Sequence, residues 1–180
     1  MAMRCKLFSL ALCLFLLPGL CATRASAAQP KLALITAPKR LKSTVPGSFY
    51  LEGDAIPVEM YHAVLLQAGR KQFIIALLAT SGYSSNVRQK YLGMIISEGR
   101  FRLNTLRLGI GSYGFGLATI HQNGKTKTVL RLFNQAGRQV GQSPVRWDSH
   151  MAHPSPIQAA PGKSGSVRIY LGRHWLRLRP

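Results

Sequence analysis

The chain has 180 residues, with 24 lysines and arginines against 5 aspartates and glutamates, which gives a formal net charge of +19. Apolar residues make up 47% of the chain. This composition excludes a disordered polyelectrolyte, because such chains are poor in aromatic and branched aliphatic residues. The length fits one domain and argues against a large multidomain enzyme. Because nearly all the charge has one sign, a partner should be anionic.

The first 27 residues have the pattern of a signal peptide. Arg4 and Lys6 precede an uncharged run from 7 to 20, and Ala25 and Ala27 form the A-x-A pattern that a signal peptidase recognises. The run is shorter than the roughly 20 apolar residues that a spanning helix needs. We therefore expect a periplasmic or secreted protein, cleaved near Ala27, without a stable transmembrane anchor.

All three cysteines, Cys5, Cys13 and Cys21, lie in the segment that we expect to be removed. An uncleaved anchor is one alternative to cleavage. A lipid attached at Cys21 is another, although Leu20 stands where a small residue is wanted. After cleavage the chain has no thiol, which excludes a cysteine nucleophile, a CxxC redox pair and thiolate metal sites.

The remaining chain alternates short apolar runs with turn residues. In chain order, the expected strands are 31–36, 58–67, 72–80, 91–97, 101–108, 113–122, 125–134, 167–171 and 174–179. Asn123-Gly124 is the clearest hairpin turn, because both residues tolerate a positive φ. The pattern predicts an all-β fold, an antiparallel β-sandwich or barrel of about 8–10 short strands, with at most one short helix near 84–90.

The domain organisation follows from composition. Residues 28–47 are expected to form a basic N-terminal arm with one possible strand, and residues 48–180 a single β domain. From 143 to 165 the chain is rich in proline, serine, alanine and glycine, which indicates a long surface loop inside that domain.

The stretch Pro57–Ala68 is ambiguous, because Pro57 near its start and Gly69 after its end would also suit a helix. A faint repeat favours a strand, since 51–61 aligns with 103–113, and the partner segment of this stretch, residues 109–121, holds four glycines and does not suit a helix. Paired with 72–80, this strand would be apolar on both faces. We therefore place the hairpin at the centre of the structure.

Catalytic motifs are weak. The run Gly109-Ile-Gly-Ser-Tyr-Gly114 matches GxGxxG, but a strand follows it where a dinucleotide site needs a helix. No G-x-S-x-G nucleophile elbow is present. Glycoside hydrolysis requires two facing carboxylates, and nothing singles out a pair among the five acids. The acids are Glu52, Asp54, Glu59, Glu98 and Asp148.

The densest set of metal-ligating residues is Asp148, His150, Met151 and His153. Carboxylate, imidazole and thioether groups can bind copper or zinc. A solvated loop with incidental histidines explains the same residues more simply. We expect no cofactor, and keep an exported hydrolase or a copper- or zinc-binding loop as the alternative function.

The last hairpin gives the most specific prediction. With Gly172-Arg173 as a two-residue turn, Arg168 pairs with Arg177 and Tyr170 with Trp175, and all four lie on the outer face. Like charges placed directly opposite each other are destabilising. The two guanidinium groups could simply extend into water, or one could stack on Trp175.

The functional interpretation of this hairpin is an anion site. Arg168 and Arg177, with Arg179 nearby, would hold a phosphate, sulfate or carboxylate, and Tyr170 and Trp175 would form a stacking platform for a sugar or base. We therefore expect an exported, non-catalytic β protein that binds an anionic polysaccharide, lipopolysaccharide or nucleic acid. Two other interpretations are a strand-donating structural subunit and a basic surface that serves only solubility.

Overall fold

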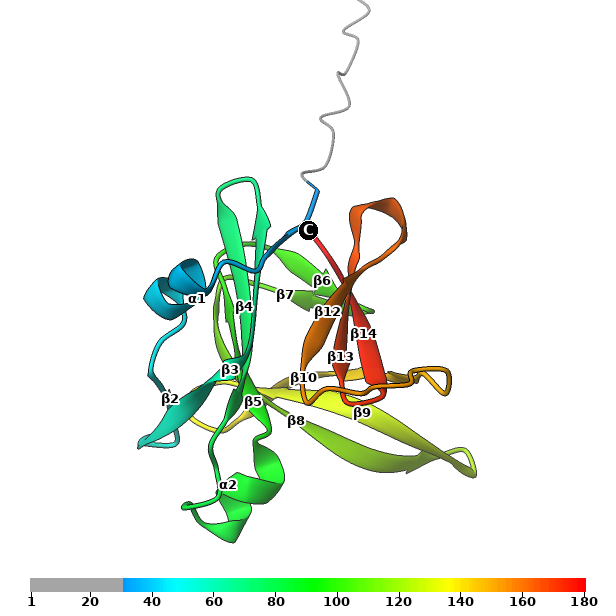
Figure 1. Ribbon diagram of the computed structural model, residues 1–180. Coiled ribbons are helices and arrows are strands. Elements are labelled where there is room, and N and C mark those ends of the chain that lie inside the picture. Colours follow the sequence, from blue (N-terminus) through cyan, green and yellow to red (C-terminus); the bar gives the residue numbers. More distant parts are fainter. Residues whose placement is uncertain (1–30) are drawn as a thin grey trace, which may run out of the picture.

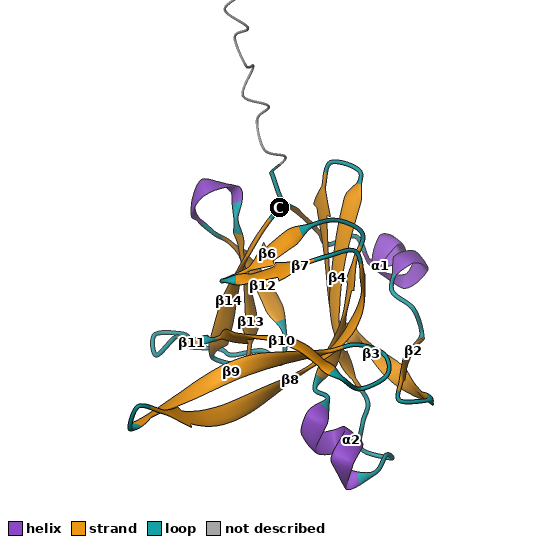
Figure 2. Cartoon of the chain, turned by 180° about the vertical axis from the view of Figure 1, so that it is seen from behind, coloured by secondary structure: helices purple, strands orange, loops and turns teal. Residues whose placement is uncertain are grey.

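The computed structural model describes residues 31–180, so the predicted signal peptide and its cleavage site lie outside the described residues. Two antiparallel sheets pack against each other, which confirms the all-β, sandwich-like prediction (Figures 1 and 2). Within residues 31–180, no helix is both long enough and apolar enough to cross a bilayer.

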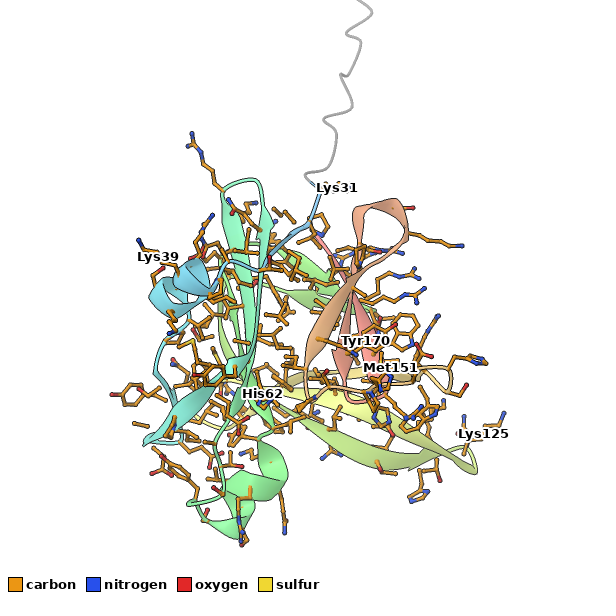
Figure 3. All side chains as sticks on the ribbon, in the orientation of Figure 1. Lys31, Lys39, His62, Lys125, Met151 and Tyr170 are labelled. Carbon is orange, nitrogen blue, oxygen red and sulfur yellow. The ribbon has the colours of Figure 1, made fainter. Side chains whose placement is uncertain are left out.

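The first sheet has eight strands in the order β1-β3-β4-β5-β8-β9-β10, with β2 paired to β3. Its strands are β1 (Ala33–Ile35), β2 (Ser48–Leu51), β3 (Asp54–Ala68), β4 (Lys71–Leu78), β5 (Gly93–Ser97), β8 (Gly111–Gln122), β9 (Lys125–Phe133) and β10 (Gln139–Pro144). The ambiguous stretch Pro57–Ala68 lies within β3, so the strand prediction is correct. The hairpin of β8 and β9 projects from the sandwich, with Lys125 at its tip (Figure 3).

The second sheet has six strands in the order β12-β13-β14-β6-β7, with β11 paired to β14. Its strands are β6 (Phe101–Leu103), β7 (Leu106–Leu108), β11 (Arg146–Trp147), β12 (Gln158–Pro161), β13 (Val167–Leu171) and β14 (His174–Arg179). The single strand expected at 101–108 is therefore two strands. The chain turns back at Asn104, whose φ is 51°, so that β6 and β7 pair with each other.

Two clusters of buried apolar side chains stabilise the fold. The first core lies between the sheets and includes Phe73 and Ile75 from the first sheet and Ile169 and Leu176 from the second. The second core lies on the other face of the first sheet, where α1 (Pro38–Thr44), α2 (Ser85–Lys90) and β2 pack against it. The β3–β4 hairpin is thus buried on both faces, as predicted.

Two parts of the chain are more ordered than the sequence indicated. The basic arm contains the helix α1, which Pro38 starts at a position where a missing N–H costs nothing, and Leu41 packs from it against the second core. With α2, whose N-cap Ser84 accepts a hydrogen bond from the Val87 N–H, the fold has two short helices.

The expected surface loop at 143–165 is also more ordered than predicted. It contains the end of β10, the strands β11 and β12, and the 3₁₀ helix η1 (Lys163–Gly165). These short strands form because they pair with β14 and β13, which are distant in the sequence.

Candidate functional site

The last hairpin has the predicted register. Arg168 lies opposite Arg177 and Tyr170 opposite Trp175 in the pairing of β13 with β14. The alternate residues, such as Leu176, belong to the first core, so these four residues point away from it. The outer face of this hairpin therefore carries two directly opposed arginines.

Neighbouring strands add arginines to the same face. Arg102 lies opposite Arg179, Arg107 lies opposite Arg102, and Arg146 lies opposite Trp175. We call the resulting surface of the second sheet the arginine face. Its members are Arg100, Arg102, Arg107, Arg146, Arg168, Arg177 and Arg179.

The local sequence gave no reason to connect Arg100, Arg102, Arg107 or Arg146 with the last hairpin. In both β6 and β7 an arginine stands between two apolar residues, so the alternation predicts that Arg102 and Arg107 point outward. What places these side chains beside Arg179 is the long-range pairing of β6 and β7 with β14, which alternation alone does not specify.

The arginines of this face are not paired with a carboxylate in the described part of the chain, although the Asp148 carboxylate accepts a hydrogen bond from the Tyr170 hydroxyl on the same hairpin. The ion pairs within residues 31–180 are His62–Glu59 and Lys90–Glu52, so none of these arginines takes part in one. The Nε atoms of Arg168 and Arg177 are buried and have no hydrogen-bond partner among residues 31–180. The Nε atom of Arg131, on β9 of the other sheet, is in the same state, so this feature is not confined to the arginine face.

Two of the arginines cover the Trp175 ring. The Cζ atom of Arg168 lies 4.9 Å from the ring centre and that of Arg146 lies 5.3 Å from it, both within cation–π range. Trp175 is only 9% exposed and Tyr170 only 5%. In this structure the two rings are thus largely covered, and Arg146 and Arg168 lie over the Trp175 ring.

The arginine face is hollowed by two clefts. The larger, which we call the four-arginine cleft, has a volume of about 690 Å³ and is lined by Arg100, Arg102, Arg107 and Arg179 together with Phe101, Leu108, Gly109 and Pro180. The smaller, the three-arginine cleft, has a volume of about 270 Å³ and is lined by Arg146, Arg177 and Arg179 together with Asn104, Thr105, Pro144 and Trp175. Among the described residues, no aspartate or glutamate lines either cleft.

Several of the residues predicted as possible metal ligands make hydrogen bonds within the protein instead. The Asp148 carboxylate accepts hydrogen bonds from the Tyr170 hydroxyl at 3.3 Å and from the His150 backbone N–H at 3.1 Å. Met151 of the same loop accepts one from the Gln158 amide, and it is drawn near Tyr170 in Figure 3. In the described chain, no three His, Cys, Asp or Glu side chains come together as a ligand set, so Asp148, His150 and His153 are not assembled.

Zinc or copper is accordingly expected to leave the melting temperature unchanged. Thermal unfolding with and without each ion checks this, because an ion that binds only the folded state raises Tm. A rise in Tm that disappears in His150→Ala would contradict the expectation and make the metal-binding loop the leading hypothesis.

The other acids mostly stabilise the fold. Glu52 accepts hydrogen bonds from the Lys90 ammonium group and from the Tyr91 hydroxyl, the latter at 2.5 Å, which ties the β2–β3 turn to the end of α2. Glu59 is paired with His62 at 2.7 Å. Glu98 accepts a hydrogen bond from the Gln72 backbone N–H at 3.1 Å. These contacts do not arrange two carboxylates across a common cleft.

Glu52→Gln is expected to reduce the loss of stability in acid. The hydrogen bonds from Lys90 and then Tyr91 hold the pKa of Glu52 below its ordinary value of 4.5. A carboxylate with a lowered pKa stabilises the folded state above that ordinary value, and the contribution is lost as pH falls through the folded-state pKa. Tm curves from neutral pH into the acid range should therefore fall less steeply in the variant than in the wild type, whereas parallel curves would contradict the assignment.

Comparison with protein-family models, with curated proteins and with solved structures finds no match to this chain.

Proposed function

We propose that this protein is exported and binds anionic polymers through the arginine face, without catalysing a reaction. The observation that carries the proposal is the gathering of six arginines on one face of the second sheet, with Arg100 beside them in the four-arginine cleft and none of them in an ion pair within residues 31–180. Opposed like charges destabilise a sheet. A ligand of opposite charge would relieve this repulsion.

Arginine is well suited to this role. Its guanidinium group is always charged and offers a planar fork of donors that pairs bidentately with phosphate or carboxylate. Binding a polyanion also releases the counterions condensed on it, which favours association at low salt.

Because the rings of Tyr170 and Trp175 are covered, the arginine face can contact only some of the chemical groups of a polymer. Because Arg146 and Arg168 lie over Trp175, the groups open to a ligand are guanidinium groups rather than aromatic faces. The contact should therefore go to the anionic groups of the polymer, and not to its bases or sugar rings. Lipopolysaccharide, acidic polysaccharide and nucleic acid share such groups, and the predicted signal peptide favours polymers of the envelope or the exterior.

The proposal is tested by measuring the binding of the mature protein to lipopolysaccharide, a heparin-like polysaccharide and DNA over a series of salt concentrations. We expect binding to at least one polymer, with log K falling linearly with log salt concentration. Absence of binding to all three at low salt, or an affinity that does not change with salt, would rule the proposal out.

A further inference from the structure

The two clefts of the arginine face are neighbours that share one side chain. Arg179 of β14 lines both of them. On one side it meets Arg102, its cross-strand partner, and on the other it meets Arg177, two residues earlier in β14. Adjacent strands lie about 4.8 Å apart and residues two apart on a strand about 6.6 Å apart, so the two clefts are separated by on the order of 10 Å.

Each cleft matches an anion with several acceptor oxygens. The four-arginine cleft offers four guanidinium groups and the three-arginine cleft offers three, with Arg179 counted in both. One or two arginine forks are enough to satisfy a planar carboxylate, whereas a phosphate group presents three acceptor oxygens and can engage more. The number of donors in each cleft therefore favours phosphate or sulfate over carboxylate.

We propose that the two clefts bind two phosphate or sulfate groups of the same ligand at the same time, with Arg179 shared between them. The inference rests on the proposed function and specifies its ligand as a chain that carries closely spaced phosphates or sulfates. Once one group is bound, the second binds intramolecularly, so a chain long enough to reach both clefts gains affinity without any new type of contact.

The test uses linear phosphates of increasing length, from orthophosphate through diphosphate and triphosphate to longer chains, at one fixed low salt concentration. The same measurement on sulfated oligosaccharides of increasing length distinguishes the two sources of tetrahedral anion. We expect affinity to rise by about 10²-fold at the length that first spans both clefts, and only slowly thereafter.

A variant that disables one of the two clefts should remove this rise in affinity with chain length. Arg107→Ala affects the four-arginine cleft and Arg146→Ala the three-arginine cleft. Each should lower the affinity of long chains far more than that of the shortest ones. The matched control is Arg88→Ala/Arg138→Ala, two exposed arginines outside both clefts, which should keep the step. The Tm of every variant confirms that it is folded.

The results separate the inference from the proposed function. If affinity rises smoothly with chain length, and Arg107→Ala and Arg146→Ala weaken long and short chains equally, then the clefts do not act together, although the protein still binds polyanions. A polycarboxylate that shows the same step as the phosphates would overturn the choice of anion. If no chain of any length binds, the proposed function itself fails.

Discussion

Leu65→Ala and Ile74→Ala are each expected to lower the free energy of unfolding by about 2–5 kcal/mol. The two residues lie opposite each other in the pairing of β3 with β4. Leu65 has no exposed surface and Ile74 is 3% exposed. Each truncation loses the favourable transfer of its side chain from water and leaves a cavity that the surrounding sheet cannot fill, so the effect should be large at both positions.

Urea unfolding of each variant measures this loss. The matched control is Tyr61→Ala on the same strand, because Tyr61 is 96% exposed and should change stability by no more than about 0.5 kcal/mol. A loss below about 1 kcal/mol in both core variants would show that the hairpin is not buried on both faces.

This hairpin was predictable because its pattern is local. Its runs Ala63–Leu66 and Phe73–Ala76 are apolar at every position, and they lie opposite each other in the structure. A strand that is apolar on both faces must be covered on both sides, which fixes its place at the centre of the fold. The register of the last hairpin was predictable for a similar reason, since a slip by one residue would mix its two faces.

The internal repeat corresponds to similar hairpins, but only over its first part. Leu51 and Leu103 are both fully buried, and each is followed by a tight turn that contains a residue with positive φ. The copies then diverge, since Val58 is 9% exposed whereas its counterpart Ile110 is 75% exposed. The repeat therefore predicts a local turn and not a common packing environment.

The rest of the site depends on contacts between distant segments. Strands as short as β11 have no periodicity of their own, and β11 forms because Arg146 and Trp147 pair with β14. That pairing brings Arg146 over Trp175 and covers a ring that the isolated hairpin would expose. The arginine face as a whole could not be predicted for the same reason, because Arg102 meets Arg179 only after β6 and β14 have paired.

Arg168→Ala/Arg177→Ala is expected to weaken polyanion binding by about 3–6 kcal/mol, because each side chain contributes charge-assisted hydrogen bonds worth about 1.5–3 kcal/mol. This is a loss of affinity of about 10²–10⁴-fold. The fold should survive the change, since removing two directly opposed like charges relieves repulsion in the sheet. Equilibrium titration with the polymer that binds the wild type best measures the loss.

The control for this variant must lie off the arginine face. Arg100→Ala/Arg102→Ala does not qualify, because both residues line the four-arginine cleft, and we expect it to weaken binding as well. Arg88→Ala/Arg138→Ala removes the same charge from exposed positions on α2 and in the turn between β9 and β10. If both double variants lose affinity equally, the binding reflects diffuse charge and not this surface.

The salt dependence of DNA binding tests most directly whether the arginine face makes the contact. For duplex DNA, the slope of log K against log salt concentration is about −0.9 for each phosphate neutralised, so the loss of two arginine contacts should make it shallower by about 1.8. We predict this change in Arg168→Ala/Arg177→Ala and a slope close to that of the wild type in Arg88→Ala/Arg138→Ala. A wild-type slope in the first variant, or the same change in both, would contradict the proposal that this face binds the polymer.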